Sequence, residues 1–319
     1  YRDETIAFES FKAGNLDYHQ ETSAKTWATG YDFAAVRDGY VIRQEVDLKS
    51  TQPMQCFVLN LRRPQFADRR VRQAFNLAFD FEWANKNLFY GQYARLGSYF
   101  QNSELAAPQA LPAGPELEIL NEVKDQVPPE VFTEVHANPV NDNPDSMRGN
   151  LQKAVQLLKE AGYEIKGGVL TDSKTGKPLT VEFLLVSPLF ERIVQPYIAN
   201  LYKLGIKGTI RMVDSAQYTR RLNVFDYDIV VGNFAQSDSP GNEQRDFWGS
   251  EAASRNGSTG NAGCRRGRRR HDPRRPPWRR LGRVTGRHRG CRRWRADPRL
   301  CQKRRRTDAI SISKRCGGA

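Results

Sequence analysis

The clearest pattern in the chain lies between residues 179 and 231, where apolar runs alternate with stretches of helical spacing. Three apolar runs have the length of a β-strand, and the two stretches between them repeat apolar residues at helical intervals. The predicted strands are 179–186, 206–213 and 227–231, and the predicted helices are 189–204 and 214–222. Strands and helices in this order are typical of parallel βαβ units. The sequence therefore predicts an α/β fold with a parallel sheet.

Further elements are predicted toward the N-terminus. The apolar run 54–61 suits a strand buried on both faces, and Asp68 can cap a helix whose apolar residues follow the helical period. Other predicted helices cover 3–14, 25–31 and 147–161. Residues 105–146 are rich in Pro, Asn and Asp and show little periodicity, which predicts a long surface excursion.

Several large side chains in this part of the chain are assigned to the core. For Trp83, Phe89, Tyr90 and Tyr93, core packing is favoured over a place in a binding cleft. Cys56 lies beside the predicted buried strand, so we expect an inert core thiol.

A polar loop follows the last predicted strand. Residues 232–242 are rich in Gly, Ser and Asn, and they continue directly from a buried strand. Ligands of parallel sheets lie beyond the carboxyl ends of the strands, an edge that here includes Ser187 and Pro188 as well. The loop can present backbone N–H groups and small polar side chains to a ligand, with a plain connector as the alternative.

Motifs for the common enzyme chemistries are not found in the first 263 residues. There is no phosphate-binding loop, zinc-protease motif, nucleophile elbow or dinucleotide fingerprint, and no apolar run approaches the ~18 residues of a membrane span. The two histidines of this part, His19 and His136, are too far apart to suggest a metal cluster. We expect no catalysis, no metal and no cofactor.

Charge separates the C-terminal end from the rest. The 319 residues carry a net charge of +14, but residues 264–319 hold 20 Arg and 2 Lys against 3 Asp, whereas residues 1–263 are net acidic. Four of the five cysteines also lie in the basic segment, which excludes a body built on disulfides.

Four interpretations apply to residues 264–319: a nucleic-acid-binding arm, a zinc site, a disordered membrane-binding tail, or the product of a shifted reading frame. The cysteine separations of 27, 10 and 15 fit no zinc-finger spacing. The segment contains no Phe, Tyr or Glu, and its abundant residues share GC-rich codons. A one-base shift permits an amphipathic helical sequence over 264–275. We favour a disordered, frameshifted tail, and a nucleic-acid-binding protein acting through this tail is the alternative function.

The stretch 57–74 reads FVLNLRRPQFADRRVRQA and is similar to the signature of the extracellular solute-binding proteins of peptide importers. The aromatic-rich residues 87–93 and the segment 239–250 resemble, in particular, the oligopeptide-binding branch of family 5 associated with microcin C uptake. The resemblance covers about residues 1–258.

This resemblance implies a fold, a function and a domain division. The fold would be a partial type II periplasmic-binding-protein fold, two-lobed and hinge-connected, with one lobe largely present and the other truncated. The function would be the capture of peptides or peptide-like compounds in the periplasm, by a monomer that delivers them to the membrane permease of an ABC importer. The implied parts are a remnant of the first lobe (1–53), the hinge strand and second lobe (54–235), a crossover back toward the first lobe (236–263) and the tail (264–319).

The resemblance also implies site residues. The hinge strand would contain Phe57 and Asn60. In dipeptide- and oligopeptide-binding relatives, an Asp shortly after the last strand of the second lobe pairs with the ligand's amino group. That place falls near Gln236 here, where the closest carboxylate is Asp238. The expected ligand-binding residues are Gln236, Ser237, Asp238 and Asn242.

Overall fold

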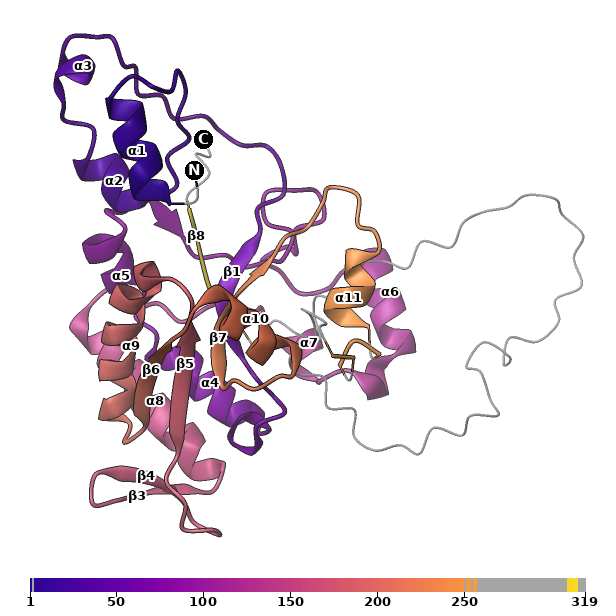
Figure 1. Cartoon of the computed structure of the whole chain (residues 1–319). Helices are drawn as coiled ribbons and strands as arrows, with labels where there is room; N and C mark the ends of the chain where they lie inside the picture. The colour runs from indigo at the N-terminus through magenta and orange to yellow at the C-terminus, as the bar shows by residue number, and fades with distance from the viewer. Residues whose placement is uncertain (2, 250, 254, 257–308, 315–319) are drawn as a thin grey trace, which may run out of the picture.

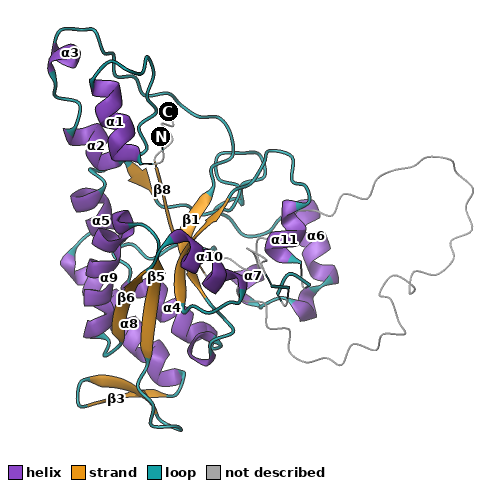
Figure 2. Ribbon diagram, in the orientation of Figure 1, coloured by secondary structure: helices purple, strands orange, loops and turns teal. Residues whose placement is uncertain are grey.

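A mixed β-sheet forms the centre of the molecule (Figures 1 and 2). The structure, a computed structural model, describes the chain except residues 2, 250, 254, 257–308 and 315–319. From one edge of the sheet to the other, the strands are β2 (Tyr93–Ala94), β8 (Ala309–Lys314), β1 (Met54–Leu59), β7 (Ile229–Phe234), β5 (Thr180–Leu185) and β6 (Lys207–Met212). A separate hairpin joins β3 (Tyr163–Lys166) to β4 (Val169–Asp172).

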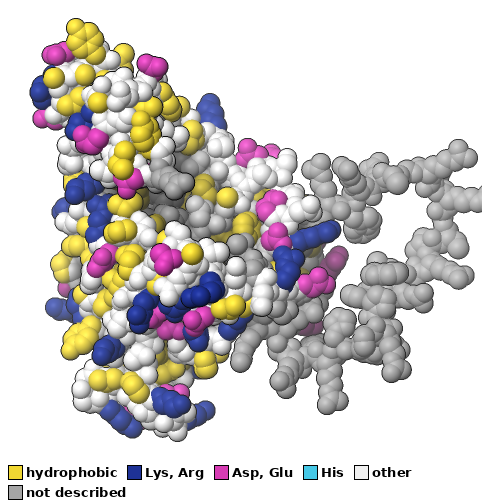
Figure 3. All heavy atoms as spheres, in the orientation of Figure 1, with side chains coloured by type: hydrophobic (Ala, Val, Ile, Leu, Met, Phe, Trp, Pro, Cys, Tyr) yellow, Lys and Arg dark blue, Asp and Glu magenta, His cyan; other side chains and the backbone are white. Residues whose placement is uncertain are grey.

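Helices cover both faces of this sheet, and further helices lie beyond one end of it. The described α-helices are α1 (Glu4–Lys12), α2 (Ala24–Thr29), α3 (Ala34–Arg37), α4 (Arg69–Ala78), α5 (Phe81–Leu88), α6 (Gly114–Glu122), α7 (Glu130–Thr133), α8 (Pro144–Glu160), α9 (Glu191–Lys203), α10 (Ser215–Asn223) and α11 (Glu243–Trp248). Helices α4, α5, α8 and α9 bury the main core on one face, while α10 covers the other face (Figure 2). Helices α1 to α3 extend the molecule beyond the end of the sheet (Figures 1 and 3).

The predicted parallel unit is confirmed. Strand β5 lies between β6 and β7 and runs parallel to both. Its Phe183 is fully buried and pairs in register with Ile210 on one side and Ile229 on the other. The helices between these strands, α9 and α10, are those that the spacing predicts, and Asp214 caps α10 through the backbone N–H of Gln217.

Strand β1 pairs with β7 in the antiparallel direction. The register runs from Met54 opposite Phe234 to Leu59 opposite Ile229. The chain thus enters this α/β unit along β1 and completes the unit with β7, which is the neighbouring strand in the sheet. Strand β1 is the segment that the family resemblance places at the hinge.

Asn60 fixes the end of β1. Its side chain is fully buried, and Nδ2 donates to the carbonyl oxygens of Phe225 at 2.9 Å and Tyr227 at 2.8 Å. Its Oδ1 accepts from the backbone N–H of Arg62, and its own N–H donates to the carbonyl of Asp228. Since buried carbonyls without partners are costly, this side chain fixes the turn before β7.

Phe57, the other residue assigned to the hinge, lies in the centre of the core. Its ring contacts those of Phe79, Phe183 and Tyr197, with ring centroids 5.6 to 5.8 Å apart. Phe57 and Asn60 therefore anchor β1 in the core, and a change of their conformation during hinge motion stays a prediction.

The expectation of a disordered tail is wrong for Ala309–Lys314. These residues form β8, which pairs in the antiparallel direction with β1 and β2. The segment alternates Ile and Ser, which suits a strand, and β1 offers an open edge opposite β7. The rest of the predicted tail lies outside the described residues, as does the stretch 264–275 on which the frameshift argument depends.

Two expectations about the region after α4 need correction. Trp83 and Tyr90 are 44% and 45% exposed, whereas Phe89 is buried as expected. Trp83 lies on the outer side of α5, away from Phe81, and Tyr90 follows the helix in a left-handed turn. The excursion 105–146 contains α6 and α7; α6 buries only Leu120 and α7 has four residues, so neither has an apolar face that would show as a period.

The assignment of residues 236–263 as a crossover back toward the first lobe stays a prediction, and the described part of this segment has contacts on both sides. Trp248 on α11 packs against Tyr99 and Phe234, both within the unit 54–235. One contact does reach the first segment, because Asp238 accepts hydrogen bonds from Thr51. Residues 250, 254 and 257–263 lie outside the description.

Replacing Asn60 by Ala should lower the free energy of unfolding by about 1–3 kcal/mol, because the Phe225 carbonyl loses its side-chain donor and the buried Tyr227 carbonyl keeps only Arg63 Nε. The matched control is Asn87→Ala, since Asn87 is exposed and bonds only within its own helix, and its cost should stay within about 0.5 kcal/mol. Urea unfolding of both variants measures the difference. Equal losses would show that Asn60 does not hold the β1–β7 junction.

Candidate functional site

A cavity of about 230 Å³ lies where the N-terminal helices meet the sheet and α9. Glu4, Thr22 and Ser23 line it from the N-terminal segment, and Phe190 and Arg192 line it from the segment that follows β5. This is the carboxyl edge of the parallel strands, where the sequence predicts ligand binding. Ligand pockets of proteins commonly measure ~300–1,000 Å³, so this cavity has room for a small group or one side chain of a larger ligand.

Two side chains of opposite charge face this cavity. Glu4 accepts a hydrogen bond from the Thr22 hydroxyl at 3.1 Å. Arg192 makes no ion pair or hydrogen bond with any residue that the structure describes, and its Nε is buried without a partner there. Arg192 also lies in the first turn of α9, where the helix dipole disfavours a positive charge. Among the described residues its charge thus has no ion-pair partner, although Glu4 lines the same cavity, and this suits an anionic group of a ligand.

Aromatic side chains form much of the remaining wall. Phe89 and Tyr93 stack with ring centroids 4.3 Å apart, and Phe57 contributes from the sheet. Burial raises the pKa of Tyr93, and the nearby charge of Arg192 opposes that rise. Cys56 also lines the cavity, but burial raises the pKa of its thiol to about 12. It is therefore protonated at neutral pH and is a poor nucleophile, in agreement with an inert core thiol.

Asp238 joins the loop after β7 to the segment before β1. Its Oδ1 accepts from the backbone N–H of Thr51 at 3.0 Å and from the Thr51 hydroxyl. These hydrogen bonds hold the pKa of Asp238 below its usual range. Its Oδ2 has no hydrogen bond to a described residue, and the side chain is exposed, so this oxygen is available to a ligand.

The other predicted binding residues make contacts within their own segment. Gln236 is buried, and its Oε1 accepts from the side chain of Gln244, which in turn accepts from the indole of Trp248 at 2.9 Å. The Ser237 hydroxyl donates to the carbonyl of Ser239 at 2.6 Å, and Asn242 is exposed at the start of α11. None of the four predicted residues, Gln236, Ser237, Asp238 and Asn242, lines the 230 Å³ cavity.

Arg192 was not among the predicted site residues, although the sequence contains a signal for it. Ser187 and Pro188 belong to the predicted ligand edge, and Arg192 lies in the helix that follows them. A basic residue in the first turn of a helix, directly after such an edge, is unfavourable for the helix alone. That conflict could have singled out Arg192.

The described residues contain no group of three or more His, Cys, Asp or Glu side chains that could hold a metal ion. None of the described helices is both long enough and apolar enough to cross a membrane.

Comparisons with known proteins give a consistent family. The model for the middle region of bacterial extracellular solute-binding proteins, family 5, matches residues 1–256. The probable peptide-binding protein YejA of Agrobacterium fabrum is 49% identical over 267 residues, which cover 83% of this chain and 43% of the relative. The peptidoglycan-binding protein YepA of the same bacterium is 36% identical, over 81% of this chain and 43% of its own. The chain thus spans less than half the length of these relatives.

Solved structures show the same fold at lower sequence identity. The oligopeptide-binding protein AppA from Bacillus subtilis, in complex with a nonapeptide, has a TM-score of 0.57 and 20% identity, over 81% of this chain and 44% of its own. A mannohexaose-bound periplasmic oligopeptide-binding protein from Thermotoga maritima has a TM-score of 0.52 and 17% identity, over 82% and 44%. The partial two-lobed periplasmic-binding-protein fold is therefore confirmed. The alternative function, nucleic-acid binding through the basic segment, finds no support in these matches.

The contact between Thr51 and Asp238 should depend on pH. Because hydrogen bonding lowers the pKa of Asp238, the contact is complete above the ordinary Asp value of about 3.9 and is lost as the pH falls through the lower folded value. The amide proton of Thr51, followed by NMR, should shift over this acidic range and should not titrate in Asp238→Asn. A Thr51 signal that titrates equally in both proteins would contradict the contact.

Proposed function

Because the chain belongs to the bacterial extracellular solute-binding proteins of family 5, we propose that it comes from the substrate-binding component of an ABC importer that captures peptides or peptide-like compounds in the periplasm. The name of the A. fabrum relative and the nonapeptide in the B. subtilis structure support a peptide ligand. The proposed partner is the membrane permease of the importer, and the proposed form is a monomer without catalysis or cofactor.

The observation that carries this proposal is Arg192, which lines the cavity at the carboxyl edge of the sheet and has no ion pair or hydrogen bond to a described residue. A peptide presents a carboxylate at its C-terminus, and a guanidinium can bind that group through two parallel hydrogen bonds. The stacked rings of Phe89 and Tyr93 offer an apolar surface for a neighbouring side chain of the peptide. In this proposal, Arg192 holds the carboxylate and the aromatic wall holds the side chain.

The other end of the peptide is assigned to Asp238. Its free Oδ2 can accept from a ligand ammonium group while Oδ1 keeps its two bonds to Thr51. The ligand would then contact the same carboxylate that links the segments before β1 and after β7. Such a contact would couple ligand binding to the hinge motion that the family resemblance implies.

Replacing Arg192 by Gln should weaken peptides with a free C-terminal carboxylate roughly 10- to 150-fold, since a charged hydrogen bond contributes ~1.5–3 kcal/mol. The same peptides with an amidated C-terminus should lose little. Calorimetric titration against the strongest binders of a synthetic peptide pool measures both losses.

Arg220→Gln is the matched control for this variant. Arg220 is an exposed arginine on α10 outside the cavity, and its replacement should change neither affinity. Equal weakening of the free and amidated peptides by Arg192→Gln would contradict a carboxylate contact.

Replacing Asp238 by Asn should weaken peptides with a free amino group by a similar factor of roughly 10 to 150, and N-acetylated peptides far less. The exposed Asp125→Asn serves as the control because it removes the same charge outside this loop. If both peptide types lose affinity equally, Asp238 only shapes the loop through Thr51. If neither loses affinity, the loop lies outside the binding site.

A further inference from the structure

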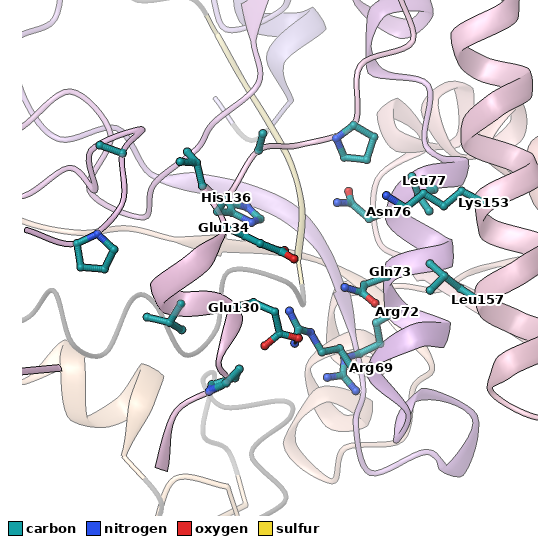
Figure 4. Close-up of a pocket in the computed structure, with 17 residues that line it drawn as sticks. Arg69, Arg72, Gln73, Asn76, Leu77, Glu130, Glu134, His136, Lys153 and Leu157 are labelled. Carbon is teal, nitrogen blue, oxygen red and sulfur yellow. The ribbon is translucent and has the colours of Figure 1, made fainter. Parts of the chain in front are cut away.

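A second cavity, of about 450 Å³, shares no described lining residue with the cavity at the sheet edge. It lies between the helices α4 and α8 on one side and the excursion that contains α7 on the other (Figure 4). Its size falls within the range of ~300–1,000 Å³ that is usual for small-molecule sites. The proposed peptide site does not use any of these residues.

The two walls of this cavity carry different charges. Arg69, Arg72 and Lys153 lie on the helical wall, while Glu130 and Glu134 lie on the wall formed by the excursion (Figure 4). A cavity with a basic and an acidic wall is complementary to a ligand that carries both charges.

Part of this charge is already compensated within the protein. Arg69 and Glu130 form an ion pair across the cavity, with Nη1 and Oε1 3.0 Å apart. Arg72 donates from Nη1 to the carbonyl oxygens of Phe66 and Ala67. The ion pair holds the excursion against α4, and the two hydrogen bonds hold the Arg72 side chain in place.

Arg72 keeps its positive charge, but these bonds to neutral carbonyls occupy its Nη1. Lys153 and Glu134 also line the cavity, and neither side chain has an ion pair or hydrogen bond with a residue in the described part of the chain. Figure 4 shows the Glu134 carboxylate pointing across the cavity toward Gln73, and Lys153 extending from α8 on the opposite wall. Gln73 adds an amide that can donate to an anion on the basic side.

The cavity also has an apolar part, since Leu77 and Leu157 line the helical wall and Val131 and Val135 line the excursion. We propose that this cavity binds a small zwitterion with an aliphatic side chain, that is, an aliphatic α-amino acid. Its carboxylate binds Lys153 and the Gln73 amide, its ammonium group binds Glu134, and its side chain lies among the four apolar residues.

Calorimetry on the full 319-residue chain tests this proposal, with L-leucine as the probe. Leucine should bind saturably, whereas N-acetyl-leucine and leucinamide, which each lack one charge, should bind about tenfold or more weakly. Lys153→Gln and Glu134→Gln should each weaken leucine by about tenfold or more. The exposed residues Lys174 and Glu104 lie outside the cavity, so the controls Lys174→Gln and Glu104→Gln should leave the affinity unchanged.

The variant Arg192→Gln separates this site from the proposed peptide site. Leucine binding that survives Arg192→Gln but is weakened by Lys153→Gln supports the second site. Binding that is lost in Arg192→Gln and unchanged in Lys153→Gln places leucine at the sheet edge and overturns the proposal. The proposal is also overturned if leucine shows no saturation up to about 10 mM, or if the control variants weaken it equally.

Discussion

Asn60 fixes strand β1 to the turn that leads into β7, and the layers of the molecule are arranged around this antiparallel pair. On one face of the sheet, the ring of Phe57 on β1 contacts Phe183 of β5 and Tyr197 of α9, so the main core packs directly on β1. At the end of the same pair, Thr51 and Asp238 join the segments that lead into β1 and out of β7. These two strands therefore position the cavity at the sheet edge and the loop 236–242.

The fold could be predicted where the signal is local. The strands and helices between residues 179 and 231 each have a clear period, and their parallel arrangement follows from their order along the chain. The direction of β1 relative to β7 could not be predicted in this way, because an apolar run looks the same in a parallel and an antiparallel neighbour. Strand β8 was missed because the arginine-rich composition around it masks a six-residue pattern.

The rule that ligands lie beyond the carboxyl ends of parallel strands led to the edge of the sheet at which the 230 Å³ cavity lies. None of the four residues predicted with it lines that cavity, and their role in binding stays a prediction. The rule could not show that Gln236 turns toward α11, because that depends on the tertiary contact with Gln244 and Trp248. For Arg192 the sequence does contain a signal, because a basic residue is unfavourable in the first turn of a helix. That signal points to a ligand site only once the structure shows the cavity beside Arg192.

The pairing of β1 with β7 also bears on the order in which the chain can fold. About 180 residues separate Met54 from its partner Phe234, and contacts of such large sequence separation form slowly. At ~5–20 residues per second, a ribosome needs roughly 10–40 s to make the intervening chain. During that time the apolar strand β1 has no partner at the side that β7 will occupy. The core of this unit can therefore close only after nearly all of its chain has been synthesised. Until then, β1 is an exposed apolar segment of the kind that chaperones bind.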